Sequence, residues 1–104
     1  DTRSTEEYKG TRGLGNRAGH IPSAKHLEWK HFLDASGRFL PDDQLKKVLD
    51  EHNVDLGKPV ITHCQSGGRS SVGAMVAEML GGKNVRNYVL GWSEYSGQLQ
   101  APIE

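Results

Sequence analysis

The sequence predicts a single α/β domain whose mainly parallel sheet is flanked by helices. Val60–His63 is a short apolar and β-branched run after a Gly-Lys-Pro breaker, which is typical of a buried strand. Residues 70–80 follow with helical periodicity, and residues 85–89 form a second strand-like run. Strands and helices that alternate in this way usually belong to a parallel sheet. At 104 residues the chain can fold around one core without a disulfide or a metal.

The first half of the chain predicts two helices and a long connection. Ser4 and Glu7 match a capping box, so a short helical turn is expected over residues 5–9. Residues 10–21 contain four glycines and predict an irregular connection. A partly buried segment follows, closed by a turn over residues 34–37, and its apolar residues are Leu27, Trp29, Phe32 and Leu33. Pro41 suits the first residue of a helix, which periodic apolar residues extend over residues 41–52.

The second half adds one longer helix and one short helix. The helix over residues 70–80 is expected to carry one apolar stripe and to end at a Gly-Gly pair; the stripe consists of Val72, Met75, Val76, Met79 and Leu80. Gly91–Tyr95 predicts a turn that leads into a short helix held by its aromatic residues.

Charge, cysteine count and hydropathy exclude several classes of protein. Thirteen basic and thirteen acidic residues leave no net charge to attract a nucleic acid or an anionic membrane. The single cysteine, Cys64, cannot form an internal disulfide, so it is a free thiol. No segment approaches the ~18 apolar residues of a membrane span, and the polar first residues are not a signal peptide. We therefore expect a soluble, cytoplasmic protein that binds neither nucleic acid nor membrane.

Cys64 is the candidate nucleophile. It stands between a strand and a helix, where parallel sheets bind ligands and the helix N-terminus favours negative charge. Together with Arg69, such surroundings lower a thiol pKa from about 8.5 to roughly 3.5–7.5. Gly67 and Gly68 permit positive φ, so the loop can curl its N–H groups toward the sulfur. The residues expected to hold an anion there are Gln65, Ser66, Gly67, Gly68, Arg69 and Ser70.

Four motifs in register resemble the rhodanese (thiosulfate sulfurtransferase) family. They are Asp1-x-Arg3 with Glu7-Tyr8-x-Gly10, then Gly19-His20-Ile21-Pro22-x-Ala24, then Cys64-x-x-x-x-Arg69-Ser70, and finally Gly91-Trp92-Ser93-Glu94-Tyr95. The likeness spans nearly the whole chain and is similar to the catalytic C-terminal domain of tandem-domain sulfurtransferases. It implies that residues 1–104 form one rhodanese-like domain of a longer chain, with a further rhodanese-like domain upstream.

The resemblance implies a ping-pong reaction without a metal or an organic cofactor. Cys64 would take a sulfane sulfur from thiosulfate or a similar small donor, and its persulfide would pass the sulfur to cyanide, a small thiol or a protein thiol. The family also implies that Asp1 and Arg3 are structural groups near the loop and that Trp92 packs close to it.

Three departures from the family pattern are visible. Mammalian-type rhodaneses bind thiosulfate with an arginine and a lysine where this chain has Glu7 and Ser66. Thiosulfate is therefore expected to be a secondary donor, with positive charge supplied by Arg69 and by Arg12 or Arg17. The apolar strand that leads into the first motif is absent before residue 1, so we expect that the sheet lacks its first strand.

Other functions are less favoured by the residues. Related phosphatases and arsenate reductases have five residues between cysteine and arginine, whereas four separate Cys64 from Arg69. A non-catalytic rhodanese-like module for interaction or sensing is the other alternative, but it would not need both Cys64 and Arg69.

The motif Gly13-x-Gly15-x-x-Ala18 lacks the flanking strand and helix of a dinucleotide site. The histidines lack metal-site spacing, and His63 is expected to pack away from Cys64 because neighbouring strand residues face opposite sides.

Overall fold

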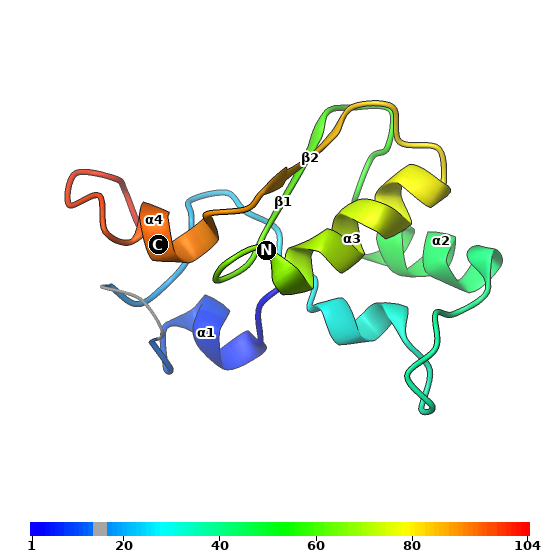
Figure 1. The fold of residues 1–104 in the computed structure, drawn as a ribbon, viewed down its shortest axis with the longest axis horizontal. Coiled ribbons are helices and arrows are strands. Elements are labelled where there is room, and N and C mark those ends of the chain that lie inside the picture. Colours follow the sequence, from blue (N-terminus) through cyan, green and yellow to red (C-terminus); the bar gives the residue numbers. More distant parts are fainter. Residues whose placement is uncertain (14–16) are drawn as a thin grey trace.

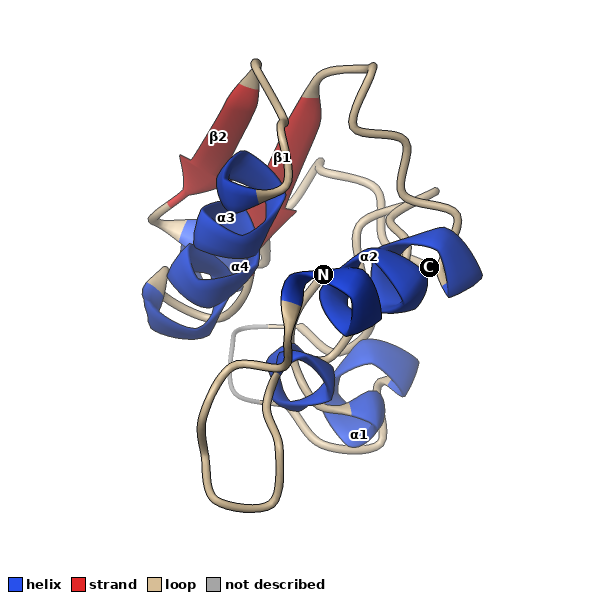
Figure 2. Ribbon diagram, turned by 90° about the vertical axis from the view of Figure 1, so that its right-hand side faces the viewer, coloured by secondary structure: helices blue, strands red, loops and turns tan. Residues whose placement is uncertain are grey.

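The computed structural model describes residues 1–13 and 17–104 (Figure 1). Its two strands, β1 (Val60–His63) and β2 (Val85–Tyr88), pair in parallel over their whole length. α3 (Gly68–Met79) connects them and packs against both strands (Figure 2). The predicted α/β class, the parallel pairing and the bounds of β1 are confirmed, and β2 is one residue shorter than predicted. Within the described ranges no helix is long and apolar enough to cross a membrane.

The remaining helices are short and surround this unit. They are α1 (Thr5–Lys9), the 3-10 helix η1 (Trp29–Phe32), α2 (Asp42–Glu51) and α4 (Gly91–Tyr95). Both hydrogen bonds of the predicted capping box are present at α1. α2 is one residue shorter at each end than predicted, because Pro41 has an extended ψ of 155° and forms the N-cap instead of the first turn. The expected irregular connection over residues 10–21 includes residues 14–16, which lie outside the described part of the chain.

α3 begins two residues earlier than predicted. Gly67 adopts a φ of +94° and turns the chain directly into the helix. Gly68 is already helical, so the expectation of positive φ is correct for Gly67 and wrong for Gly68. Arg69 and Ser70 consequently belong to the first turn of α3 and not to the preceding loop.

α3 buries only part of the predicted stripe: Val76 is buried, and Val72 and Leu80 pack against the core. Met75 and Met79 are 47% and 49% exposed, so the expected apolar stripe is wrong at these positions. The fully buried residues of α3 are Ser70, Gly73, Val76 and Ala77. At Gly73 a β-carbon would lie 3.2 Å from Thr2 Cγ2, which shows how closely the neighbouring chain approaches the helix. Small residues are required there, and apolar spacing alone does not reveal this.

The hydrophobic core lies where α2, η1 and α3 meet. Its buried members are Leu27, Phe32, Leu45, Leu49 and Val76. The segment that the sequence marks as partly buried therefore supplies two core residues. The predicted turn after it is present, since the Asp34 carboxylate accepts hydrogen bonds from the backbone amides of Ser36 and Arg38.

The first two residues lie beside the carboxyl end of β1 (Figure 1). The amide of Thr2 donates to the carbonyl of His63, and the amide of Leu27 donates to the carbonyl of Asp1, both at 2.9 Å. A groove of about 670 Å³ is lined by residues of β1 and by apolar side chains that include Leu27 and Leu49. The strand expected before Asp1 stays a prediction.

Candidate active site

Cys64 follows β1 directly and is 1% exposed. Its sulfur accepts hydrogen bonds from the backbone amides of Gly67 at 3.2 Å and Ser70 at 3.3 Å. Burial by itself works to raise the pKa of the thiol. Hydrogen bonds from the Ser70 hydroxyl and from the amides of Ser70, Ser66 and Gly67 outweigh burial, so the pKa of Cys64 is lowered. The loop therefore favours the thiolate, which is the nucleophilic form.

The backbone amides at the beginning of α4 donate hydrogen bonds to the carbonyls of this loop. The amide of Trp92 donates to the carbonyl of Cys64 at 2.8 Å, and the amide of Ser93 donates to the carbonyl of Gln65 at 3.1 Å. Gly91, immediately before them, has a φ of +54° and lies directly against these two carbonyls. The free N-terminal amides of a short helix thus fix the backbone that carries the nucleophile.

The guanidinium of Arg69 is paired with the carboxylate of Glu7. Its Nη1 and Nη2 atoms lie 2.6 and 3.0 Å from the two carboxylate oxygens of Glu7. Glu7 is 3% exposed, and the hydrogen bonds from Arg69 lower its pKa to about 2. Arg69 is therefore paired with Glu7 and also interacts with the Cys64 sulfur, and its role in binding the substrate stays a prediction.

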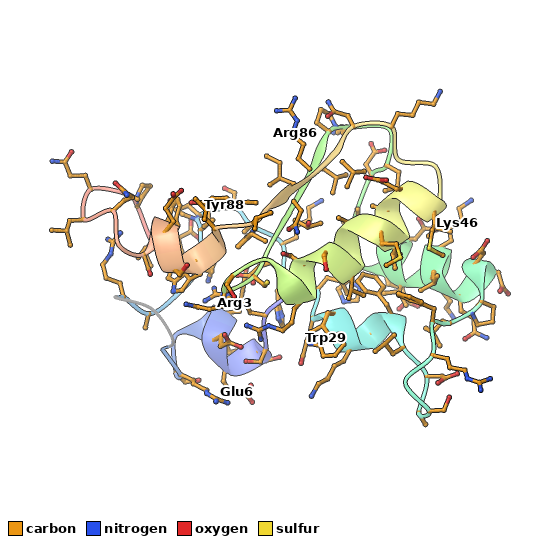
Figure 3. All side chains as sticks on the ribbon, in the orientation of Figure 1. Arg3, Glu6, Trp29, Lys46, Arg86 and Tyr88 are labelled. Carbon is orange, nitrogen blue, oxygen red and sulfur yellow. The ribbon has the colours of Figure 1, made fainter. Side chains whose placement is uncertain are left out.

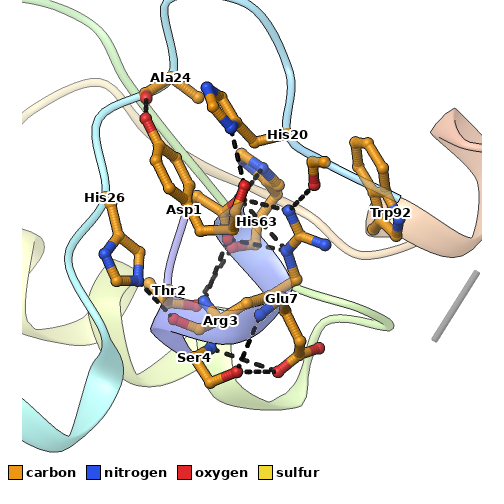
Figure 4. Close-up of polar contacts among 12 residues, drawn as sticks. Asp1, Thr2, Arg3, Ser4, Glu7, His20, Ala24, His26, His63 and Trp92 are labelled. Atoms are coloured by element: carbon orange, nitrogen blue, oxygen red, sulfur yellow. Dashed lines mark hydrogen bonds and ion pairs between the residues drawn. The ribbon is translucent and has the colours of Figure 1, made fainter. Parts of the chain in front are cut away.

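Asp1, Arg3 and Trp92 form a buried cluster beside the loop (Figure 4). The Arg3 guanidinium binds the Asp1 carboxylate through Nε at 3.0 Å and Nη2 at 2.8 Å, and it binds the carbonyl of Gly19 at 2.7 Å. Its central carbon lies 4.4 Å from the centroid of the Trp92 ring, a cation–π arrangement. Asp1 and Arg3 thus form a buried ion pair that packs against Trp92, and the roles that the family resemblance implies for these three residues stay predictions.

His63 and Arg17 face other parts of the molecule. The Nε2 atom of His63 lies 3.4 Å from the Asp1 carboxylate. Burial nevertheless lowers the pKa of His63, helped by the nearby Arg3, because Asp1 is already paired with that arginine. Arg17 donates to the carbonyls of Ser96 and Gln98. The guanidinium of Arg17 therefore supports the C-terminal segment.

Asn87 is a site residue that sequence reasoning does not identify. It lies on β2 opposite Thr62, and its side chain bonds to Gly67 and Ser70 at the two ends of the turn around the sulfur. A polar residue within a strand run is a weak sequence signal. Its significance depends on the pairing of β1 with β2, which places it against the loop.

Comparisons with known proteins place this arrangement in a family. The rhodanese-like domain model matches residues 1–98. A thiosulfate sulfurtransferase of Pseudomonas aeruginosa is 36% identical over 104 residues, which are 100% of this chain and 38% of that protein. A thiosulfate sulfurtransferase of Azotobacter vinelandii is 33% identical with the same coverage. The chain thus spans well under half the length of these curated relatives.

Solved structures share the fold. The Tum1 protein of Saccharomyces cerevisiae superposes with a TM-score of 0.80 at 27% identity, over 100% of this chain and 38% of that one. The anaerobic ergothioneine biosynthesis enzyme of Chlorobium limicola superposes with a TM-score of 0.90 at 23% identity, over 99% of this chain and 27% of that one. Since the family model covers nearly all of the sequence and the predicted motifs meet around one cysteine, the chain belongs to the family of rhodanese-like domains.

Proposed function

We propose that this domain is a sulfurtransferase in which Cys64 carries the transferred sulfur. The observation that carries the proposal is the position of the Cys64 sulfur among N–H donors that stabilise negative charge. The same donors can stabilise the terminal sulfur of a persulfide anion, by the logic of an oxyanion hole. The relatives named thiosulfate sulfurtransferases support this proposal.

The reaction consists of two displacements. The Cys64 thiolate attacks the outer sulfur of the donor, a new S–S bond forms, and the donor's own bond to that sulfur breaks. With thiosulfate, sulfite leaves with the electron pair, so no oxidant or general base is needed. An acceptor such as cyanide or a thiolate then attacks the terminal sulfur and releases the Cys64 thiolate. Because residues 1–104 contain one cysteine, the acceptor must come from outside this domain.

Mass spectrometry of the intact protein tests this function. After incubation with thiosulfate or a persulfide donor, the protein is expected to gain one sulfur, which cyanide removes as thiocyanate. A Cys64→Ala variant is expected to gain none. If no sulfane donor loads the protein while iodoacetamide still alkylates Cys64, the sulfurtransferase proposal is wrong. Turnover of p-nitrophenyl phosphate in that case would favour oxyanion hydrolysis.

The paired Glu7 and Arg69 indicate which donors suit the site. Thiosulfate carries two negative charges, and the carboxylate of Glu7 offsets the arginine that would otherwise attract it. A donor of low charge, such as a small organic persulfide, meets no such disadvantage. We therefore propose that persulfides are better donors than thiosulfate for this domain.

A Glu7→Gln variant is expected to raise kcat/KM for thiosulfate about tenfold, mainly through a lower KM, because Arg69 becomes free to form a charge-assisted hydrogen bond. Glutamine also completes a capping box, so α1 keeps its N-cap. Steady-state assays with thiosulfate and with a neutral persulfide donor give the comparison, and the persulfide kinetics are expected to change little.

Glu6→Gln is the matched control, since Glu6 is exposed next to Glu7 and points away from the molecule (Figure 3). It removes the same charge without touching Arg69. Equal gains in both variants would show that overall charge, and not the Glu7–Arg69 pair, limits the use of thiosulfate.

A further inference from the structure

The side chain of Asn87 joins both strands to the turn around Cys64. Its Oδ1 atom accepts hydrogen bonds from the Ser70 hydroxyl at 2.6 Å and from the Thr62 hydroxyl at 3.2 Å. Its Nδ2 atom donates to the carbonyl of Gly67 at 3.1 Å. The residues on the other side of this network, Gly67 and Ser70, are the two whose amides contact the sulfur.

These contacts fix the orientation of the amide group. The carbonyl of Gly67 can only accept a hydrogen bond, so Nδ2 must face it and Oδ1 must face the two hydroxyls. Ser70 has a single hydroxyl proton, and in the structure that proton is directed at Asn87. The amide of Ser70 lies 3.3 Å from the sulfur, and the hydroxyl of the same residue also favours the anionic form of Cys64. Asn87 and the sulfur therefore compete for the same proton.

We propose that Asn87 is a positioning residue that controls where the Ser70 hydroxyl donates its proton, and thereby how strongly the loop holds negative charge on sulfur. When the sulfur is uncharged, the proton rests on Oδ1 of Asn87. When the sulfur is a thiolate or a persulfide anion, the hydroxyl turns toward it. Thr62 still donates to Oδ1 in that state, so the exchange leaves no buried acceptor unpaired. The role in persulfide stabilisation rests on the proposed sulfurtransferase function.

Other charged groups around Cys64 act on it in the same way in every Asn87 variant. Arg3 and Arg69 interact favourably with the thiolate. Glu7 is paired with Arg69, and burial lowers the pKa of His63, which favours its neutral form. None of these groups contacts Asn87 through a hydrogen bond in the described structure, so differences among Asn87 variants report on its own network.

Two substitutions at Asn87 are expected to move the pKa of Cys64 in opposite directions. Asn87→Asp introduces a negative charge and a stronger acceptor that retains the Ser70 proton, so the pKa rises by about one unit and alkylation below that pKa slows about tenfold. Asn87→Ala removes the competing acceptor, so the hydroxyl donates to sulfur and the pKa falls. The measurement is the rate of iodoacetamide alkylation against pH, which reports on one thiol because the chain has one cysteine.

Loss of loop packing alone would shift both variants in the same direction, and that result would overturn the proposal. In a Ser70→Ala background the shift in the Cys64 pKa caused by Asn87→Ala is expected to disappear, and its persistence would also overturn the proposal.

Asn84→Asp and Asn84→Ala are matched controls at an exposed position just before β2, and neither is expected to shift the pKa of Cys64. If Asn87→Asp does not fold, as judged by circular dichroism, the Asn87→Ala and Ser70→Ala pair still decides. Alkylation needs no sulfur donor, so this test can fail while the sulfurtransferase proposal stands.

Discussion

An Arg3→Met variant is expected to lose a large part of the free energy of unfolding of this domain. Arg3 is 1% exposed and forms a bidentate pair with the buried Asp1 carboxylate. Removing one partner of a buried ion pair leaves an uncompensated charge and costs about 3–5 kcal/mol. A domain of this size has roughly 5–15 kcal/mol in total. The variant is therefore expected to unfold at a much lower urea concentration, measured by circular dichroism.

Arg86→Met is the matched control, because Arg86 projects from β2 into solvent (Figure 3). Its free energy of unfolding is expected to stay close to that of the parent protein. An Asp1→Asn, Arg3→Met double variant should recover part of the loss, since no unpaired charge is then buried. If Arg3→Met unfolds at the same urea concentration as the control, the Asp1–Arg3 pair does not stabilise the fold as described.

The sequence predicts most accurately those elements that local chemistry determines. β1 begins after a proline and ends at the cysteine loop, and α1 has a complete capping box, so both are predicted with their observed bounds. The buried face of α3 could not be predicted from local chemistry. It depends on how closely Thr2 approaches Gly73, and these residues come together only in the folded chain.

Partners of the site residues could not be predicted for the same reason. Cys64 and its loop are recognisable because the residues adjoin one another in the sequence. Glu7 and Arg69 are 62 positions apart, and nothing local in either segment identifies the other as its ion-pair partner. Asn87 is 20 positions from Gly67, and only the register between β1 and β2 brings the two together. Both of these unpredicted contacts affect the charge around Cys64, on which the proposed donor preference and thiolate stability depend.

A Gly91→Ala variant is expected to slow sulfur loading of Cys64 on the order of 100-fold, the usual effect of losing one oxyanion-hole donor. At a φ of +54° a β-carbon on Gly91 would collide with the carbonyl oxygen of Cys64 and lie 2.8 Å from that of Gln65. These carbonyls must move, and the loop amides that face the sulfur move with them. Single-turnover loading followed by mass spectrometry measures the rate.

Gly37→Ala separates this displacement from simple backbone strain. Gly37 also has a positive φ, +82°, but a β-carbon there meets no atom within 4 Å. Its alanine variant bears a similar conformational cost, about 1–2 kcal/mol, far from the cysteine loop. Loading at the parent rate in Gly37→Ala together with slow loading in Gly91→Ala would show that the position of the Cys64 carbonyl limits the reaction. Equal loading rates in the two variants would show that the loop amides keep their alignment without the close approach of Gly91.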